Sequence, residues 1–360
     1  MRSDLPDFPW DSLAADKALA AAHPGGIVDL SVGTPVDPVP AVVRAALAGP
    51  AADVPGYPTT HGPASLREAI AGSLARRFGV TVDPVPVLPT IGSKELVAWL
   101  PTLLGLGAEH TVVIPELAYP TYEVGVRLAG AQLVRSDSTA ALGPRRVALI
   151  WLNSPSNPTG RVLPVEHLRK VVDWARERGA VVASDECYLS LSEGALSVLH
   201  PDVCGGSHEG LLAVHSMSKS SSLAGYRAGF VTGDPRLVAG LLEVRKHAGM
   251  MVPRPVQAAM EAAAADDAHV TEQAQVYARR RVRLRAAMEA AGYRIDHSEA
   301  GLYLWATAGE PGRVTVRRLA EAGILVAPGD FYGPTGAQHV RVGLTATDER
   351  IEAAVERLKA

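Results

Sequence analysis

Six short apolar runs constrain the fold of this chain more than any other feature of its sequence. They are rich in Val, Ile and Leu, they do not alternate with polar residues, and they lie at 87–90, 111–114, 147–152, 180–184, 211–215 and 228–232. Such runs are typical of strands buried on both faces of a parallel sheet. Helical patterns separate several of them; Leu168, Val171, Val172 and Ala175, for example, mark one helix face. The alternation predicts an α/β fold with a large, doubly wound, mostly parallel sheet.

The pattern changes near residue 255. A long Ala- and Arg-rich helical stretch to about residue 290 precedes predicted strands at 302–306, 324–327 and 339–344 and helices at 314–322 and from residue 348. A chain of 360 residues suits one large domain and one smaller domain. We predict an N-terminal segment (1–40) that packs on the small domain or a neighbouring subunit, a large domain (41–250) and a small α+β domain (251–360).

Charge and composition exclude several classes of protein. The formal net charge of −3 gives no reason to expect binding to nucleic acid or to an anionic membrane. The five arginines between Arg279 and Arg285 are interpreted as a solvated helix face. The opening MRSDLPDFPW is acidic and interrupted by proline, unlike a signal peptide, and the longest apolar stretch (96–106) is too short to span a bilayer. Two cysteines without a CxxC motif indicate no zinc site and favour a cytoplasmic location.

Polar groups follow four of the predicted strands, at the point where each strand ends. The motifs are Ile91-Gly92-Ser93-Lys94-Glu95, Asn153-Ser154-Pro155-Ser156-Asn157-Pro158-Thr159-Gly160, Asp185-Glu186-Cys187-Tyr188 and Ser216-Met217-Ser218-Lys219, with Arg227 eight positions beyond the lysine. In open α/β sheets, ligands bind outside the carboxyl ends of the strands. The sequence therefore predicts that an anion-binding helix start, an amide, a carboxylate with a phenol, and a lysine meet at one site.

These groups match the chemical needs of pyridoxal phosphate. Its aldehyde needs a lysine, its pyridine nitrogen a carboxylate, and its phosphate hydroxyl, amide and guanidinium donors. Each motif alone has an ordinary structural explanation, such as a helix cap, a turn or an exposed lysine. The chain has no GxxxxGK[ST], HExxH or GxSxG motif, so it lacks the sequence marks of a nucleotide P-loop, a zinc protease or a serine hydrolase.

Taken together, the motifs resemble those of the fold-type I, class I/II aminotransferases. The stretch from Ser216 through Lys219 to Arg227 and Gly229 is similar to that family's lysine signature, and Asn157-Pro158-Thr159-Gly160 and Asp185-Glu186-Cys187-Tyr188 match two further family marks. The resemblance covers essentially the whole chain. It implies the fold-type I transferase fold, a pyridoxal phosphate cofactor and a homodimer with shared active sites.

The resemblance also implies a role for each matched residue. Lys219 is expected to carry the cofactor as a Schiff base and to shuttle protons, and Asp185 to pair with the pyridine nitrogen. Asn157 and Tyr188 are expected to hydrogen-bond ring oxygen O3′, and Tyr119 to stack on the ring. The three catalytic residues are thus Lys219, Asp185 and Tyr188, and no metal is expected.

The phosphate and the substrate have their own implied partners. The phosphate is expected to lie among Gly92, Ser93, Lys94, Ser216, Ser218 and Arg227, with Tyr57 reaching it from the other subunit. Lys94 departs from the small or hydroxyl residue usual there, and it either contacts the phosphate or points to solvent. Arg341 is the expected clamp for the substrate α-carboxylate, since guanidinium binds carboxylate in a bidentate way. Gly33, Asn157 and Tyr119 are expected to contact the substrate as well.

A narrower resemblance concerns the substrate. Residues 5–11, 29–40 and 249–257 are similar to actinobacterial succinyldiaminopimelate aminotransferase, which passes an amino group from glutamate to N-succinyl-2-amino-6-oxopimelate in lysine biosynthesis. Arg254 and Lys246 are candidates for the succinyl carboxylate. The alternatives are another aminotransferase of the class, for aspartate, aromatic or LL-diaminopimelate substrates, and a C–S β-lyase on the same cofactor scaffold.

Overall fold

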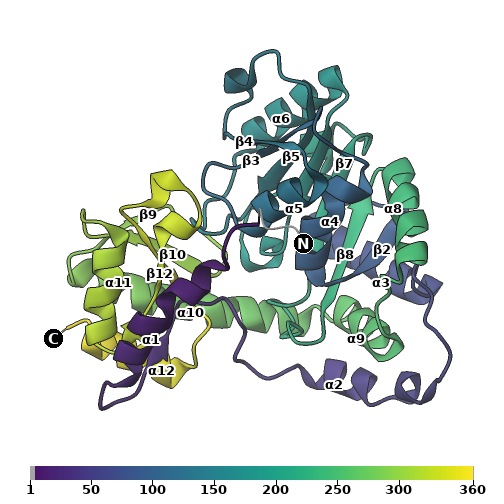
Figure 1. The fold of residues 1–360 in the computed structure, drawn as a ribbon. Helices are drawn as coiled ribbons and strands as arrows, with labels where there is room; N and C mark the ends of the chain where they lie inside the picture. Colours follow the sequence, from purple (N-terminus) through teal and green to yellow (C-terminus); the bar gives the residue numbers. More distant parts are fainter. Residues whose placement is uncertain (1–4, 360) are drawn as a thin grey trace.

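A mixed seven-stranded sheet forms the centre of the larger part of the molecule in the computed structural model, which describes residues 5–359 (Figure 1). The strand order is β2-β8-β7-β6-β5-β3-β4, and β8 runs antiparallel to both of its neighbours while the other neighbouring pairs are parallel. The strands are β2 (Val87–Ile91), β3 (Thr111–Ile114), β4 (Gln132–Arg135), β5 (Val147–Asn153), β6 (Val181–Asp185), β7 (Leu211–Ser216) and β8 (Ala228–Gly233). The doubly wound, mostly parallel sheet predicted from the apolar runs is confirmed, and the sequence pattern missed only the edge strand β4.

Helices cover both faces of this sheet. One face packs against α4, α5 and α8, and the other against α3, α6, α7 and α9. Their bounds are α3 (Ala64–Phe78), α4 (Gly92–Leu103), α5 (Thr121–Ala129), α6 (Val165–Arg178), α7 (Pro201–Cys204), α8 (Pro235–Ala248) and α9 (Arg254–Ala265). In α3 the buried face is Leu66, Ile70 and Leu74, and the helix ends at Gly79, whose φ of 65° lies in the left-handed region that glycine tolerates.

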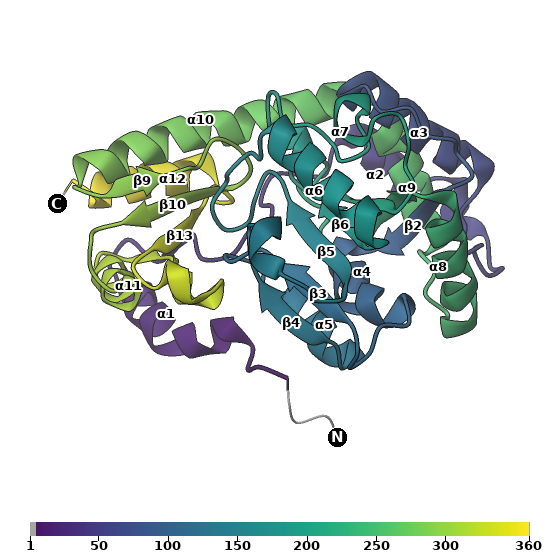
Figure 2. The same ribbon diagram turned by 90° about the horizontal axis from the view of Figure 1, so that it is seen from above.

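A second core lies around a smaller, antiparallel sheet of order β12-β13-β10-β9. These strands are β9 (Arg294–Asp296), β10 (Tyr303–Thr307), β12 (Ala327–Pro328) and β13 (Val340–Gly343), and the accompanying helices are α10 (Ala268–Ala290), α11 (Gly312–Glu321) and α12 (Asp348–Arg357). Figure 2 shows α10 running from the small sheet to the helices beside the large sheet.

The described part of the N-terminal segment lies against the small sheet's helices. A short 3-10 helix (Pro9–Leu13) leads into α1 (Ala14–Ala21), which packs on α11. Strand β1 (Val28–Asp29) then pairs in parallel with β11 (Ile324–Leu325). The sequence did not indicate α1. Helix α2 (Ala41–Leu47) follows, and it packs on α9.

Two predicted elements are each divided in the structure. The predicted strand 324–327 is two short strands, β11 and β12, because the chain pairs first with β1 and then, past Val326, with β13 in another sheet. The predicted long helix after residue 255 is α9 and α10, which meet at an extended Asp266. The Asp266 side chain accepts from the amide of Ala268, the first residue of α10, at 3.1 Å.

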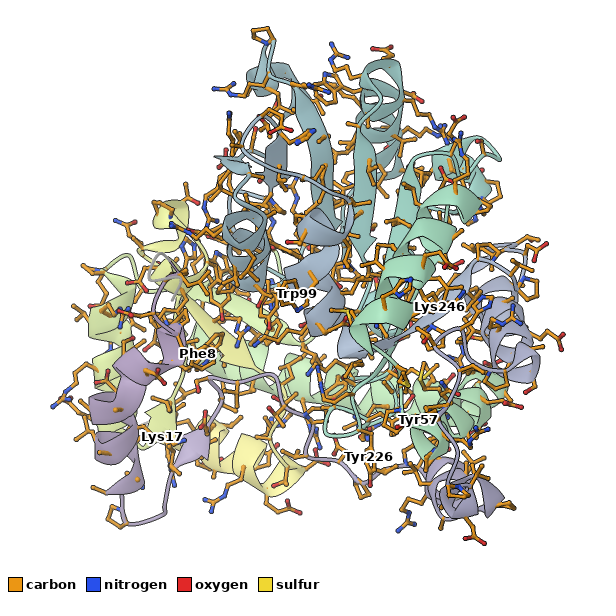
Figure 3. The ribbon with its side chains drawn as sticks, turned by 45° about the vertical axis from the view of Figure 1, so that its right-hand side comes forward. Phe8, Lys17, Tyr57, Trp99, Tyr226 and Lys246 are labelled. Atoms are coloured by element: carbon orange, nitrogen blue, oxygen red, sulfur yellow. The ribbon has the colours of Figure 1, made fainter. Side chains whose placement is uncertain are left out.

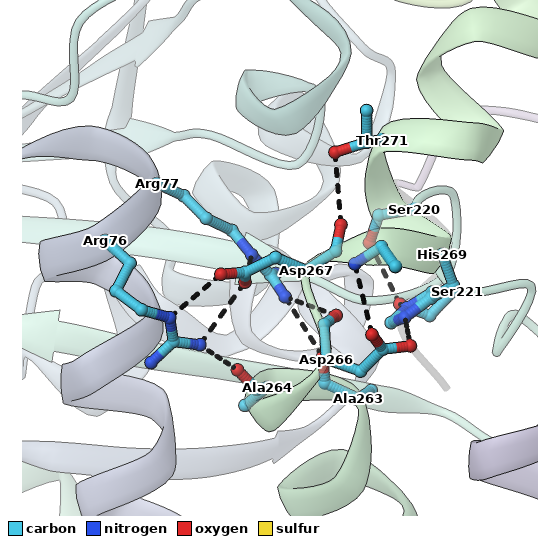
Figure 4. Close-up of polar contacts among 11 residues, drawn as sticks. Arg76, Arg77, Ser220, Ser221, Ala263, Ala264, Asp266, Asp267, His269 and Thr271 are labelled. Atoms are coloured by element: carbon cyan, nitrogen blue, oxygen red, sulfur yellow. Dashed lines mark hydrogen bonds and ion pairs between the residues drawn. The ribbon is translucent and has the colours of Figure 1, made fainter.

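The joint between α9 and α10 is held to the large sheet's helices by polar contacts (Figure 4). Arg76 and Arg77 of α3 donate to the Asp267 carboxylate at 2.9 and 2.5 Å. His269 contacts Asp266 at 2.9 Å on one ring nitrogen and Ser221, two residues beyond Lys219, at 2.9 Å on the other. Since α9 packs against α2 and α3, we propose that the large domain extends past residue 250 to this joint.

The arginine cluster of α10 is not a solvated helix face throughout, so that interpretation was wrong for part of it. The Arg280 side chain is only 4% exposed and pairs with Asp37 at 2.6 Å and with Asp348 at 2.7 Å. Arg281 donates to the Gly301 carbonyl. Arg280 thus contacts the N-terminal segment and α12, and Arg281 contacts the loop before β10. A buried charge needs such partners, because burial removes it from water.

Two kinds of feature are absent from residues 5–359. None of the helices there is long and apolar enough to cross a membrane. No three His, Cys, Asp or Glu side chains gather there as metal ligands.

Candidate active site

A cavity of about 600 Å³ opens at the carboxyl edge of the large sheet, with walls from α4, the small sheet and the N-terminal segment. Most of the site residues predicted from the sequence line it: Gly33, Ser93, Lys94, Tyr119, Asn157, Asp185, Tyr188, Ser216, Ser218, Lys219, Arg227 and Arg341. Gly92 begins α4 next to them, with φ of 69°, and a Cβ added there would collide with the Arg227 guanidinium.

Tyr57 does not line this cavity. Its side chain is 92% exposed, the largest exposure among the hydrophobic residues exposed in the described chain. Figure 3 shows it on the flank of α3 and α9, away from Phe8 and Lys17. Its expected role across a subunit interface stays a prediction.

The strand topology explains why distant parts of the sequence meet here. Strands β5, β6 and β7 are neighbours and run parallel, so their last residues lie at one edge. Asn153 pairs in register with Asp185, and Ser216 ends the next strand. The Asn153 side chain donates to the Asp185 carbonyl at 2.8 Å and accepts from the Asn157 amide at 2.7 Å, which fixes the turn that carries Asn157.

Asp185 is a buried carboxylate held by two donors. The Tyr122 hydroxyl donates to its Oδ2 at 2.9 Å and the Cys187 amide to its Oδ1 at 3.2 Å. Burial raises the pKa of Asp185, and hydrogen bonds from Cys187 and Tyr122 oppose that rise. A cation placed against the carboxylate would therefore be strongly favoured, as the pyridinium role requires.

Lys219 is a buried amine. Its Nζ donates to the Gly33 carbonyl of the N-terminal segment. Burial, together with the nearby charges of Arg341 and Arg227, lowers the pKa of Lys219 to about 8, against the opposing effect of Cys187. An amine that loses its proton near neutral pH can attack an aldehyde and can accept a proton from carbon.

Arg341, on β13, lies in a buried aromatic box. Its guanidinium carbon is 3.9 Å from the Tyr303 ring centre and 5.0 Å from that of Tyr332. It donates to Asn157 Oδ1 at 2.9 Å and to the Ser31 carbonyl at 2.6 Å, and its Nε has no hydrogen-bond partner within residues 5–359. These contacts are with neutral oxygens and aromatic rings, so a substrate carboxylate would supply the negative charge that balances the guanidinium.

The start of α4 and the loop after β7 form a cradle of donors. Gly92 donates its amide to the Arg227 carbonyl at 2.8 Å, and the Arg227 guanidinium donates to the Ala224 carbonyl at 2.6 Å. Burial and the charge of Arg227 lower the pKa of Lys94, whose ammonium lies 5.6 Å from the Phe8 ring centre. Lys94 is an exposed residue of the cavity wall, and the cradle suits a phosphate dianion.

Several cavity residues escaped the sequence analysis. Tyr303 contacts the Tyr188 hydroxyl at 3.2 Å, and the Trp10 indole donates to the Ser31 carbonyl at 3.2 Å. No local motif marks these residues, because other elements bring them to the site. Tyr122, which contacts Asp185 from outside the cavity lining, had a weak signal, since it lies three residues beyond Tyr119 at the start of α5.

The residues present fit pyridoxal phosphate in chemistry and in arrangement. The cavity brings an amine with a lowered pKa, an acceptor-only carboxylate and a cationic, hydroxyl-rich cradle to one place. A Cβ at Gly33 would collide with the Tyr303 hydroxyl, so glycine there lets the N-terminal segment approach the cavity wall.

Comparisons with known proteins agree with this chemistry. The family model for aminotransferases of class I and II matches residues 26–358. The chain is 66% identical to the probable aminotransferase Rv1178 of Mycobacterium tuberculosis over 99% of this chain and 86% of the relative. It is 59% identical to the 4-dedimethylamino-4-oxo-anhydrotetracycline transaminase OxyQ of Streptomyces rimosus over 99% of each.

Solved structures share the whole fold. The aminotransferase AspB of Helicobacter pylori superposes with a TM-score of 0.89 at 27% identity, over 99% of this chain and 98% of that one. A double mutant of Thermus thermophilus aspartate aminotransferase gives 0.87 at 26% identity, over 99% and 97%. The chain belongs to the class I and II aminotransferases, enzymes of fold type I that depend on pyridoxal phosphate.

Proposed function

We propose that this aminotransferase passes an amino group from glutamate to N-succinyl-2-amino-6-oxopimelate, in the biosynthesis of diaminopimelate and lysine. Two relatives support the proposal: the chain is 31–32% identical to LL-diaminopimelate aminotransferases of Aquifex aeolicus and Syntrophobacter fumaroxidans, over 99% of its length. The similarity of residues 5–11, 29–40 and 249–257 to succinyldiaminopimelate aminotransferase supports it further.

The observation that carries this substrate is Lys17 of α1. Lys17 lines the cavity together with the apolar side chains of Trp10, Leu13 and Leu325, and its ammonium is 3.9 Å from Asp29. An extended acyl arm could pass these apolar groups and reach the ammonium with its terminal carboxylate.

The two earlier candidates for the succinyl carboxylate do not line the cavity. Arg254 donates to the Tyr57 carbonyl, and Lys246 pairs with Glu243 at 2.6 Å. Figure 3 shows Lys246 on α8 and Lys17 far from it on α1.

The chain's own residues account for the transfer as follows. When bound, pyridoxal phosphate supplies an electron sink for the substrate Cα–H bond. Lys219 would hold the cofactor aldehyde and, once displaced by the substrate amine, would move the proton from Cα. Arg341 would clamp the α-carboxylate common to both substrates, and Asp185 would keep the ring nitrogen protonated. Asn157 and Tyr188 would orient the ring oxygen.

A half-reaction screen tests the proposal. The cofactor-loaded protein is first converted to its amine form with glutamate and then mixed with the oxo acids that correspond to succinyl-diaminopimelate, acetyl-diaminopimelate and acetylornithine. We expect return to the aldehyde spectrum to be fastest with the succinyl compound, and Lys17→Met to remove that advantage. Equal rates on all three would leave the enzyme an aminotransferase without this specificity.

A second candidate substrate is a polycyclic ketone. The 59% identity to the anhydrotetracycline transaminase over nearly the full length of both chains favours it. Adding an anhydrotetracycline 4-ketone to the screen separates the two acceptors, and aspartate, aromatic and LL-diaminopimelate substrates complete the set. Release of pyruvate and ammonia from a cysteine conjugate would instead indicate the C–S β-lyase.

A further inference from the structure

Tyr122 lies in the first turn of α5 and is fully buried. Its ring stacks on Trp151 of β5, with 5.0 Å between ring centres and 26° between planes. The Tyr119 and Tyr122 rings meet edge to face, with 6.1 Å between ring centres and 89° between planes. Because neighbours pack on it from two directions, its hydroxyl has one fixed position.

That hydroxyl is directed at Asp185. It donates to Oδ2 at 2.9 Å, while the Cys187 amide donates to Oδ1 at 3.2 Å. Each carboxylate oxygen thus has one fixed donor and keeps lone pairs for a further donor. The phenol stays protonated, since burial and then the charge of Asp185 raise its pKa well above the ordinary value.

Burial works against the charge on Asp185. The residue is buried between the cavity and Tyr122 of the apolar core of α4, α5 and the sheet, and burial is the largest influence on its pKa, in the upward direction. The Tyr122 hydroxyl and the Cys187 amide are held in place by the fold and offset this effect of burial on the carboxylate. A hydrogen bond to a charged acceptor stabilises more than one between neutral groups.

We infer that Tyr122 is a positioning residue, which holds the Asp185 carboxylate ionised and oriented toward the nitrogen of the cofactor ring. Tyr122 acts through Asp185 and does not itself line the cavity. The inference concerns cofactor binding and is independent of the amino acceptor proposed above.

The test removes one hydroxyl and keeps the ring. Tyr122→Phe leaves the packing on Trp151 intact, and Tyr277→Phe is the matched control, because it removes a buried hydroxyl of α10 that has no hydrogen-bond partner within residues 5–359. Cofactor-free protein is titrated with pyridoxal phosphate, and the visible absorbance of the bound cofactor is recorded against pH. The melting temperature of the cofactor-free protein reports the fold separately.

We expect Tyr122→Phe to weaken cofactor binding about 10- to 100-fold and to shift the pH midpoint of the absorbance, while Tyr277→Phe changes neither. In an Asp185→Asn background the Tyr122→Phe change should have little further effect on affinity, since the two groups act as one unit. Wild-type affinity and midpoint in Tyr122→Phe would overturn the inference. So would equal losses from Tyr122→Phe with and without Asp185→Asn.

Discussion

At the scale of single residues, burial decides the chemistry of two cations that the proposed transfer depends on. Lys219 and Arg341 both lie in the cavity wall and donate to neutral oxygens, Lys219 to the Gly33 carbonyl and Arg341 to the Asn157 side chain, and each responds in its own way. The amine gives up its proton more readily because water no longer solvates its charge, whereas a guanidinium keeps its charge in any protein environment. The same cavity therefore holds a base and a permanent cation.

The lowered pKa of Lys219 predicts a stability effect whose sign can be worked out. Its pKa falls from 10.5 to about 8 in the folded protein, so between these values the unfolded chain binds more protons. Stability therefore rises with pH across that window. The destabilisation that comes from burying the protonated amine is complete below about pH 8. We expect cofactor-free Lys219→Met to be more stable than wild type at pH 7 by roughly 3 kcal/mol.

Urea unfolding of both proteins at pH 7 and at about pH 11, above the unfolded pKa of Lys219, measures this effect. The difference between them should vanish at the higher pH. A constant difference across pH would show that packing of the methionine, and not proton release, stabilises the variant.

Arg341→Lys tests the carboxylate clamp. Lysine keeps the charge but loses the planar, two-point geometry and the contact with the Tyr303 ring. We expect kcat/KM to fall roughly 10- to 100-fold for glutamate and for the oxo acid alike, mainly through KM. Arg313→Lys on α11, which pairs with Asp330 at the surface, is the control and should retain wild-type kinetics. A loss confined to one substrate would assign Arg341 to that substrate's side chain.

At the scale of elements, α10 connects the two halves through a buried arginine. Arg280 binds Asp37 of the N-terminal segment and Asp348 at the start of α12, so one side chain ties three segments together. Its removal would leave the Asp37 carboxylate, whose side chain is 18% exposed, without its cation.

We therefore expect Arg280→Ala to lower the free energy of unfolding by about 2–4 kcal/mol. Arg279→Ala, at the exposed neighbouring position, should change it by less than about 0.5 kcal/mol. Chemical denaturation of both variants gives the comparison, and equal effects would mean that α10 tolerates the loss of this ion pair.

At the scale of the whole molecule, the exposed Tyr57 predicts a second subunit. Its side chain is 92% exposed in the single chain, so its hydroxyl is open to a site in a neighbouring subunit, as the family resemblance of Tyr57 implies. We expect the protein to be a dimer by light scattering, and Tyr57→Phe to weaken pyridoxal phosphate binding about tenfold by removing a hydrogen bond to the phosphate across the interface.

Mixed dimers make this prediction sharper. A Tyr57→Phe chain paired with a Lys219→Ala chain has one site in which Lys219 and the partner's tyrosine are both present. That site should bind the cofactor with wild-type affinity. Weak binding in the mixed dimer would place Tyr57 in its own subunit's site, and a monomeric protein would remove the shared site altogether.

The sequence by itself determined the large sheet and the residues at its edge. Apolar runs specify buried strands, and parallel neighbours bring their carboxyl ends together, so Asp185, Asn157 and Ser216 could be assigned to one site from order alone. The role expected of each of these residues followed from the resemblance of their motifs to those of the class I/II aminotransferases.

Only the tertiary structure decided what closes the site. Trp10, Ser31 and Tyr303 reach the cavity because the N-terminal segment and the small sheet pack against the large one, and no local pattern records such contacts. The division of 324–327 between two sheets and the burial of Arg280 have the same origin. Periodicity reports the local environment of a segment, whereas the partner of a side chain depends on which distant segment covers it.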